Sequence, residues 1–142
     1  MNYNNYMEQV VQRRTTKYTD RVIAILRWLQ HATNAEIAAA LRHDYPRVSA
    51  TTVHRITQRL QADGVIGLAP ATTHGCLRYD SNPVPHDHFV CSSCDGLHDI
   101  TIAPALRREL ARQVADCLVD GPLIITGTCH PCHHDNLIHK EK

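Results

Sequence analysis

The sequence predicts an α+β chain of 142 residues made of two small units. Apolar residues recur at helical spacing through most of residues 1–62, whereas residues 86–134 carry short strand-like runs around two Cys-x-x-Cys pairs. Between them lies Ser-Asn-Pro-Val-Pro at 81–85, where two prolines stiffen the chain and exclude a helix. These three observations predict a first unit over residues 1–80, a hinge at 81–85 and a second unit over 86–134.

The first unit contains four segments with apolar residues at the i, i+3, i+4 repeat of an amphipathic helix. The predicted helices cover residues 3–11, 19–31, 34–43 and 50–62. Thr33 and Glu36 have the spacing of a capping box, which marks the start of the third helix. Ser49 is predicted to cap the fourth helix, and Gly64 is available for a left-handed cap after its end.

The third and fourth helices are predicted to form a helix-turn-helix, because both are short and a Tyr-Pro-Arg turn separates them. Strands predicted over 65–68 and 76–79 would follow it as a wing. The outer face of the fourth helix carries hydroxyl, amide, imidazole and guanidinium groups, which bind phosphates and base edges. The predicted DNA-binding residues are Ser49, Thr51, Thr52, His54, Arg55, Gln58 and Arg59. Residues 1–80 are therefore predicted as a winged-helix DNA-binding domain, with an ordinary solvated helix face as the alternative.

The second unit alternates short strands with one helix. Strands are predicted over 86–91, 97–102 and 123–128, and the polar tail 135–142 is expected to be flexible. Pro104 marks the start of the helix, and the pair Gly121-Pro122 is predicted to end it. The apolar face of this helix is predicted to consist of Leu106, Leu110, Val114 and Leu118.

Four cysteines in two Cys-x-x-Cys pairs predict a closed, tetrahedral zinc site. They are Cys91, Cys94, Cys129 and Cys132. The sequence shows no signal peptide and no run of about 20 apolar residues, so we expect a cytoplasmic protein that does not span a membrane. Paired cysteines in the cytoplasm hold metal more often than they form disulfides, which are the alternative. Cys76 and Cys117 stand outside the pairs and are expected to be buried small hydrophobes.

The net charge of +1 conceals an asymmetry between the two halves. Residues 1–62 hold 9 Lys or Arg and 4 Asp or Glu, a balance of +5. Residues 63–142 hold 6 and 10, a balance of −4. A basic half joined to an acidic half rich in His and Cys suggests nucleic acid at one end and metal at the other. On charge alone, a solvated surface without function is the alternative.

A second metal-ligand pattern precedes the first cysteine pair. His86 and His88 place two imidazoles on one face of a strand, and Asp99 adds a carboxylate. A mixed imidazole and carboxylate site suits Fe(II), Mn(II) or Zn(II), whereas an all-thiolate site suits zinc. The alternative for the two histidines is a pair of polar positions on an edge strand.

Three segments together make the sequence resemble the ferric uptake regulator family of bacterial metal-dependent repressors. They are residues 49–55, 86–94 and 129–132, and the likeness runs from the first predicted helix to Cys132. Within this family the sequence looks most like the peroxide-sensing (PerR) branch. The gap of six from Asp80 to His86 fits that branch, and an Asp at position 99 favours it.

The resemblance implies a regulatory site for Fe²⁺ or Mn²⁺, with Zn²⁺ as a further option. Its residues would be His31, Asp80, His86, His88 and Asp99. The resemblance also implies a homodimer whose second unit is the dimerisation domain and which binds a double-stranded DNA operator with an inverted repeat. A peroxide sensor of this kind releases DNA when a ligand histidine, His31 or His86, is oxidised.

Three alternatives stay open on the sequence. The first is a plain sensor of iron, manganese or zinc that ignores peroxide, and the second is a structural zinc adaptor without a regulatory site. The third is a zinc enzyme, which we do not expect because the deaminase signature His-x-Glu is absent. Thr51 and His54 depart from the family's recognition-helix pattern, and Asp95 stands where Gly is usual, so the operator sequence is not predicted.

Overall fold

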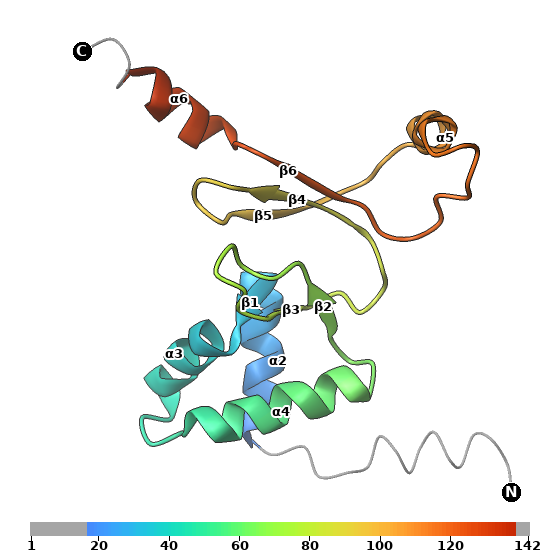
Figure 1. Cartoon of the computed structure of the whole chain (residues 1–142). Helices are drawn as coiled ribbons and strands as arrows, with labels where there is room; N and C mark the ends of the chain where they lie inside the picture. Colours follow the sequence, from blue (N-terminus) through green and yellow to red (C-terminus); the bar gives the residue numbers. More distant parts are fainter. Residues whose placement is uncertain (1–16, 139–142) are drawn as a thin grey trace, which may run out of the picture.

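The structure is a computed structural model that describes residues 17–138, with side chains to 134. The predicted helix over 3–11 lies outside the described residues. Figure 1 shows two units: three helices beneath one small sheet, and a second small sheet above it flanked by two further helices. No helix among residues 17–138 is long and apolar enough to cross a membrane.

The first unit is built from α2, α3 and α4 and a three-stranded antiparallel sheet of order β1-β3-β2. The bounds are α2 Lys17–Leu29, β1 His31–Thr33, α3 Asn34–Asp44, α4 Ala50–Ala62, β2 Gly67–Ala69 and β3 Arg78–Asp80. Its core is aliphatic, and the largest completely buried side chains include Val22, Leu26, Ile37, Leu41 and Val53. The winged-helix prediction is confirmed at the level of fold, because a three-helix cluster is followed by the β2–β3 hairpin.

Helix starts were predicted well. The Thr33 hydroxyl accepts from the Glu36 N–H at 3.3 Å, and the Glu36 carboxylate accepts from the Thr33 N–H at 2.7 Å, which completes the capping box. The Ser49 hydroxyl accepts from the Thr52 N–H at 3.1 Å at the start of α4. Gly64 has a φ of 70°, the left-handed conformation that was expected after the end of α4.

The end of α2 was predicted wrongly. The helix ends at Leu29, and Gln30 takes a left-handed φ of 64° that turns the chain. His31 therefore does not end a helix but begins β1, a three-residue strand that periodicity did not predict because it is too short.

The two wing strands begin about two residues later than predicted. The N–H groups of Val65 and Ile66 donate to the Leu60 carbonyl at 2.9 and 3.4 Å, so these residues close the C-terminal turn of α4 instead of joining a strand. Gly67 then opens β2 beneath the hinge. A Cβ at this position would lie 2.7 Å from the carbonyl oxygen of Asn82, so only glycine lets the hinge pass this close.

The second unit is a three-stranded sheet of order β5-β4-β6, in which β4 pairs antiparallel with β5 and parallel with β6. The bounds are β4 Asp87–Cys91, β5 Leu97–Ile100, α5 Pro104–Gln113, β6 Ile124–Gly127 and α6 His130–Ile138. Helix α6 covers residues 135–138, so that part of the predicted flexible tail is helical.

Helix α5 is shorter than predicted. It ends at Gln113 because Ala115 and Asp116 adopt left-handed φ angles of 55° and 58°, so Gly121-Pro122 does not terminate it. Its predicted apolar face is also not covered in the single chain: Leu106 is 50% exposed and Leu118, beyond the helix, is 82% exposed. No residue of α5 is buried.

Candidate metal centres

Five predicted ligands from both units converge at the junction between the two sheets. They are His31, Asp80, His86, His88 and Asp99, and one ligand atom from each lies within 4.8 Å of the others. Strand pairing explains the convergence, because His31 is the cross-strand partner of Asp80 and His88 is the partner of Asp99. His86 joins these two pairs from the end of the hinge.

The three imidazole Nε2 atoms surround two carboxylate oxygens. The Nε2 atom of His31 lies 2.7 Å from Asp99 Oδ1, and that of His86 lies 3.0 Å from the same oxygen. His88 Nε2 lies 3.2 Å from Asp80 Oδ2, which is also 3.3 Å from His86 Nε2 and 3.5 Å from His31 Nε2. All five groups therefore direct their donor atoms at a single point.

The orientation of these groups fits a metal ion. The Nε2 atoms of His31 and His86 are buried, and neither makes a hydrogen bond of acceptable geometry despite its nearby carboxylates. The Nδ1–H of His86 donates to the Val84 carbonyl at 2.7 Å, which leaves the lone pair on Nε2. The Asn82 N–H donates to Asp80 Oδ1 at 2.7 Å, so Oδ2 is the oxygen that faces the histidines. A bound ion would satisfy these two unpartnered atoms, and three nitrogens with two oxygens suit Fe(II), Mn(II) or Zn(II).

Electrostatics at this cluster raise the pKa of His31 and of His86 in the metal-free chain. Burial alone lowers the pKa of His31, but contacts with Asp80 and Asp99 outweigh it and raise that pKa above 6.5. For His86, burial again lowers the pKa, and the Val84 carbonyl and the two carboxylates raise it. Burial raises the pKa of Asp80, but His31 and the Asn82 N–H hold it below 3.8. A metal at this site would take the place of protons on these rings.

The four paired cysteines form a second cluster within the second unit. Cys91, Cys94, Cys129 and Cys132 bring their sulfurs within 4.8 Å of one another. Cys94 Sγ and Cys129 Sγ lie 3.7 Å apart, close to the spacing of about 3.8 Å that a tetrahedral zinc with bonds of about 2.3 Å requires. All six cysteines of the chain are free, so the disulfide alternative is wrong for this structure.

Two thiols of this cluster have pKa values shifted in opposite directions. The backbone N–H of Cys129 donates to Cys91 Sγ at 3.3 Å, and this bond, followed by one from Cys94, lowers the pKa of Cys91 to about 6. Hydrogen bonding with Cys129 and Cys94 raises the pKa of Cys132 to about 12. A divalent cation is what removes the remaining protons from such a cluster, so the donor set fits zinc.

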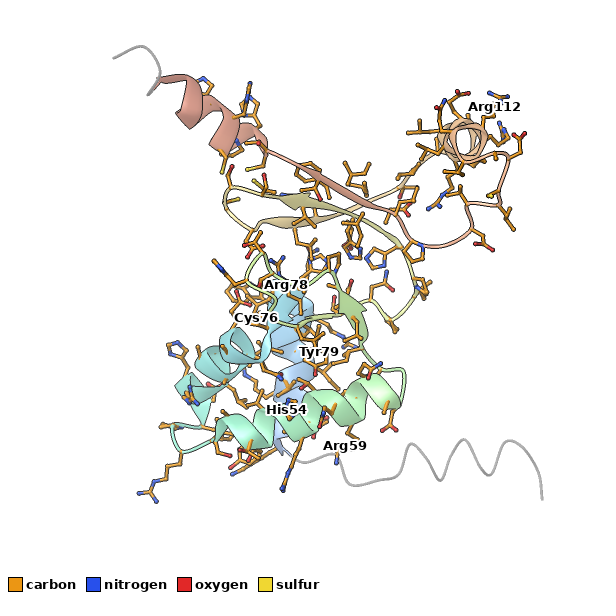
Figure 2. The ribbon with its side chains drawn as sticks, in the orientation of Figure 1. His54, Arg59, Cys76, Arg78, Tyr79 and Arg112 are labelled. Atoms are coloured by element: carbon orange, nitrogen blue, oxygen red, sulfur yellow. The ribbon has the colours of Figure 1, made fainter. Side chains whose placement is uncertain are left out.

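The predicted DNA-binding residues lie together along α4, but they are not equally available. Arg55 and Gln58 are exposed on its outer face. Arg59 is exposed too, yet its guanidinium donates to the Thr19 hydroxyl of α2 at 2.9 Å. His54 lies 3.2 Å from the side-chain amide of Asn34, so it is also engaged within the unit. Figure 2 labels His54 and Arg59 on α4.

The rest of the predicted set serves the helix start. Ser49 and Thr52 hydrogen-bond to each other through their hydroxyls at 2.9 Å in addition to the cap, and Thr51 is exposed beside them.

The expectation for the two unpaired cysteines was wrong, because Cys76 and Cys117 are both exposed. Cys76 lies in the loop between β2 and β3, where tight turns keep its side chain out of the core.

Sequence reasoning named the nine residues that form the two clusters but missed the groups that orient them. The carbonyl of Val84 and the N–H of Asn82 belong to the hinge, which appeared in the sequence only as a spacer. Backbone groups leave no residue-type signal, so sequence could not identify these contacts.

Comparisons with known proteins agree with this architecture. A profile of the Ferric uptake regulator family matches residues 11–116. The Peroxide-responsive repressor PerR of Staphylococcus aureus (strain NCTC 8325 / PS 47) is 31% identical over 118 residues, which span 77% of each chain.

Two solved structures share the fold at low sequence identity. The ferric uptake regulator Fur of Helicobacter pylori has a TM-score of 0.70 at 18% identity, covering 91% of this chain and 90% of that one. The Campylobacter jejuni peroxide stress regulator has a TM-score of 0.63 at 20% identity, covering 93% and 100%. The profile match over most of the sequence, the PerR relative and the shared fold lead to one conclusion: the chain belongs to the ferric uptake regulator family.

Proposed function

We propose that this family member is a metal-dependent transcriptional repressor that senses peroxide through the cluster at the junction of its two units. The observation that carries the proposal is that donor atoms from both units, His31 and Asp80 from one and His88 and Asp99 from the other, lie within 4.8 Å. A ligand that binds one arrangement of two units more tightly than any other shifts the population toward that arrangement. The 31% identity to PerR of Staphylococcus aureus supports peroxide as the signal.

In this proposal each unit has its own task. Residues 1–80 bind DNA, residues 81–85 act as the hinge and residues 86–134 form the dimerisation domain. The α4 face contacts the operator through Arg55 and its neighbours. The metal at the five-residue cluster fixes the angle between the units and thereby the position of α4.

The surface of the second unit supports a homodimer. Strand β6 lies at the edge of its sheet, and there Ile124 is 58% and Ile125 43% exposed. Leu106 and Leu110 of α5 add further exposed apolar area. A second copy would cover this apolar edge, and two α4 helices related by a two-fold axis would read an inverted repeat in double-stranded DNA. DNA binding makes the cytoplasm the proposed location.

The candidate ligands also define how the signal would act. Bound Fe(II) would supply the one-electron chemistry that splits a peroxide O–O bond. The rings of His31 and His86 border that site, with no hydrogen bond on Nε2, and are the proposed targets of oxidation. An oxygen added to either ring makes its nitrogen a weaker donor. Loss of His31 as a ligand would weaken the tie to the first unit, so DNA would be released.

The four-cysteine cluster is proposed to hold a structural Zn²⁺ rather than the sensing metal. All four of its cysteines belong to the second unit, so a zinc here would connect β4 to α6 and stabilise the proposed dimerisation domain. It does not join the two units.

The test uses protein whose cysteine cluster holds zinc and whose five-residue cluster is loaded with Fe(II), Mn(II) or Zn(II). The DNA is a duplex that the Mn(II) form has selected from a random library. Fluorescence anisotropy before and after dilute peroxide reports DNA binding, and peptide mass spectrometry locates added oxygen. The proposal expects DNA release only from the Fe(II) form, with one oxygen added to His31 or His86.

Two results would count against the proposal. DNA release without oxygen on either ring would contradict the oxidation mechanism. An Fe(II) form that keeps its DNA after peroxide would replace the peroxide sensor with a plain sensor of iron, manganese or zinc.

A further inference from the structure

We infer that Arg78 and Asp95 form a latch, a positioning pair that holds the wing against the Cys91–Cys94 turn and lowers the metal concentration required for DNA binding. The inference rests on the proposed function, because it concerns the same change in arrangement of the two units. It adds a contact between the units that needs no regulatory metal.

The latch is a charged hydrogen bond across the junction. Arg78 lies on β3 of the first unit, and Asp95 lies in the turn between β4 and β5 of the second. The guanidinium Nη2 donates to Asp95 Oδ1 at 2.6 Å. The Arg78 side chain is only 7% exposed and that of Asp95 is 26% exposed, so water screens this pair much less than a surface ion pair. Figure 2 labels Arg78 at this junction.

The same carboxylate also holds the wing loop. The Thr73 N–H donates to Asp95 Oδ1 at 3.0 Å and lies 3.2 Å from Oδ2, and the Thr73 hydroxyl donates to Oδ2 at 3.3 Å. The loop is closed on itself by bonds from Gly75 to Thr72 and from Thr72 to Cys76. Asp95 therefore contacts a preformed turn and a strand of the wing at once.

The Cys91–Cys94 turn sets the direction of the Asp95 carboxylate. Asp95 follows Cys94 directly, has a left-handed φ of 65°, and donates its own N–H to the Cys91 carbonyl at 2.9 Å. The next residue is Gly96, where a Cβ would approach Cys94 Sγ to 3.2 Å. The conformation that gathers the thiols therefore also fixes the direction of the Asp95 side chain.

The latch and the five-residue cluster favour the same arrangement of the units. In one structure the latch is closed and the five donor atoms lie within 4.8 Å. Apparent affinity equals intrinsic affinity multiplied by the fraction of molecules already in the competent arrangement. A latch that populates this arrangement without metal therefore reduces the metal needed to reach half-maximal DNA binding.

The test uses substitutions that the backbone at Asp95 accepts. Asp95→Asn suits a left-handed φ and keeps an acceptor for Thr73 while removing the charge that pairs with Arg78. Asp95→Gly suits the same φ and removes every side-chain contact. Asp44→Asn is the matched control, because it breaks the Arg21–Asp44 ion pair inside the first unit.

Mn(II) is titrated into each zinc-containing protein on the selected duplex, and DNA binding is followed by anisotropy. We expect the half-maximal Mn(II) concentration to rise ~5–10-fold in Asp95→Asn, consistent with the loss of charge assistance from one hydrogen bond, and further in Asp95→Gly. DNA affinity at saturating Mn(II) and zinc content should match wild type, and Asp44→Asn should leave the half-maximal concentration unchanged. Without Mn(II), hydrogen exchange in residues 70–77 should be faster in both Asp95 variants.

Three results would overturn the inference, and each points to a different cause. Unchanged half-maximal Mn(II) concentrations in both Asp95 variants would show that the pair does not bias the units. Loss of zinc from Asp95→Asn would make Asp95 a structural residue of the cysteine turn. If wild-type protein binds the duplex equally well without Mn(II), the proposed function itself fails and the latch has nothing to modulate.

Discussion

The two metal clusters of this chain differ in what they connect. The four cysteines all lie in the second unit, and a metal there would fasten β4 to α6. The five-residue cluster draws its residues from β1 and β3 of the first unit and from β4, β5 and His86, directly after the hinge, in the second. A metal within one unit stabilises that unit, whereas a metal between two units selects their relative arrangement. The position of each cluster therefore supports the structural role proposed for the cysteines and the regulatory role proposed for the five-residue cluster.

The largest expected effect comes from breaking the cysteine cluster. Cys94→Ser should remove all tightly bound zinc and the dimer with it, because three thiolates no longer close the site. Zinc analysis and size-exclusion chromatography on the same sample measure both. A Cys94→Ser protein that stays dimeric with one zinc per chain would show that the four cysteines do not hold a structural zinc. Cys117→Ser, outside the cluster, is the control.

Breaking the five-residue cluster should abolish the regulation of DNA binding by metal while leaving the fold intact. His86→Ala is expected to weaken Mn(II) binding by ~100-fold or more, since even partners in the outer shell of a metal site are worth ~10–100-fold. Zinc content and circular dichroism should not change. His98→Ala is the control, because His98 is an exposed neighbour on β5 outside the cluster. Equal losses of Mn(II) and zinc in His86→Ala would mean that the two clusters are not independent.

The two arginines of α4 should differ in their effects. Arg55 is exposed, so Arg55→Ala is expected to weaken binding to the selected duplex by ~1–3 kcal/mol if it reads a base. Arg59 bonds to Thr19, so Arg59→Ala should lower thermal stability more than Arg55→Ala does. Anisotropy titrations and thermal melts of both variants distinguish them. Unchanged DNA affinity in both variants would show that another surface of the protein binds DNA.

The smallest effect should be a pH dependence of metal binding that is confined to the five-residue cluster. Metal requires neutral imidazoles, and the raised pKa values of His31 and His86 keep these rings protonated to higher pH than usual. Mn(II) affinity should therefore fall as pH drops from about 8 to about 6, whereas zinc stays bound. Without metal, the stability of the fold depends on pH in the opposite direction to the Mn(II) affinity. A histidine whose pKa rises on folding stabilises the fold below its unfolded pKa, and this contribution is lost as pH rises through the folded value. Calorimetric Mn(II) titrations across this range test the dependence.

Local chemistry made much of this structure predictable. The Thr33–Glu36 capping box and the Ser49 cap placed the starts of α3 and α4, because a cap depends only on residues within one turn. The cysteine pairs were likewise visible as short-range spacing. Resemblance to a family, rather than spacing, indicated that His31 and Asp80 join the same site.

The parts that sequence did not predict depend on distant contacts. Pairing of His31 with Asp80 brings together residues that are far apart in the chain, and β1 is too short to show periodicity. The premature end of α5 rests on the left-handed Ala115 and Asp116, and the alanine gives no residue-type signal for such a turn. The Arg78–Asp95 contact crosses between units, so no local pattern indicates it.

The central claim, that a metal at the five-residue cluster fixes the angle between the units, can be measured directly with native thiols. Cys76 lies in the wing loop and Cys117 in the second unit, both exposed, whereas zinc would protect the other four cysteines from thiol-reactive labels. Spin labels on Cys76 and Cys117, in protein diluted with unlabelled chains, report this distance by pulsed electron spectroscopy. Because Mn(II) is paramagnetic and would disturb the labels, diamagnetic Zn(II) is the metal added to the five-residue cluster. The account predicts a broad distribution when only the cysteine cluster holds zinc, which becomes narrow when a further equivalent of Zn(II) is added and stays broad in His86→Ala. Identical distributions with and without the added Zn(II) in the wild-type protein would contradict it.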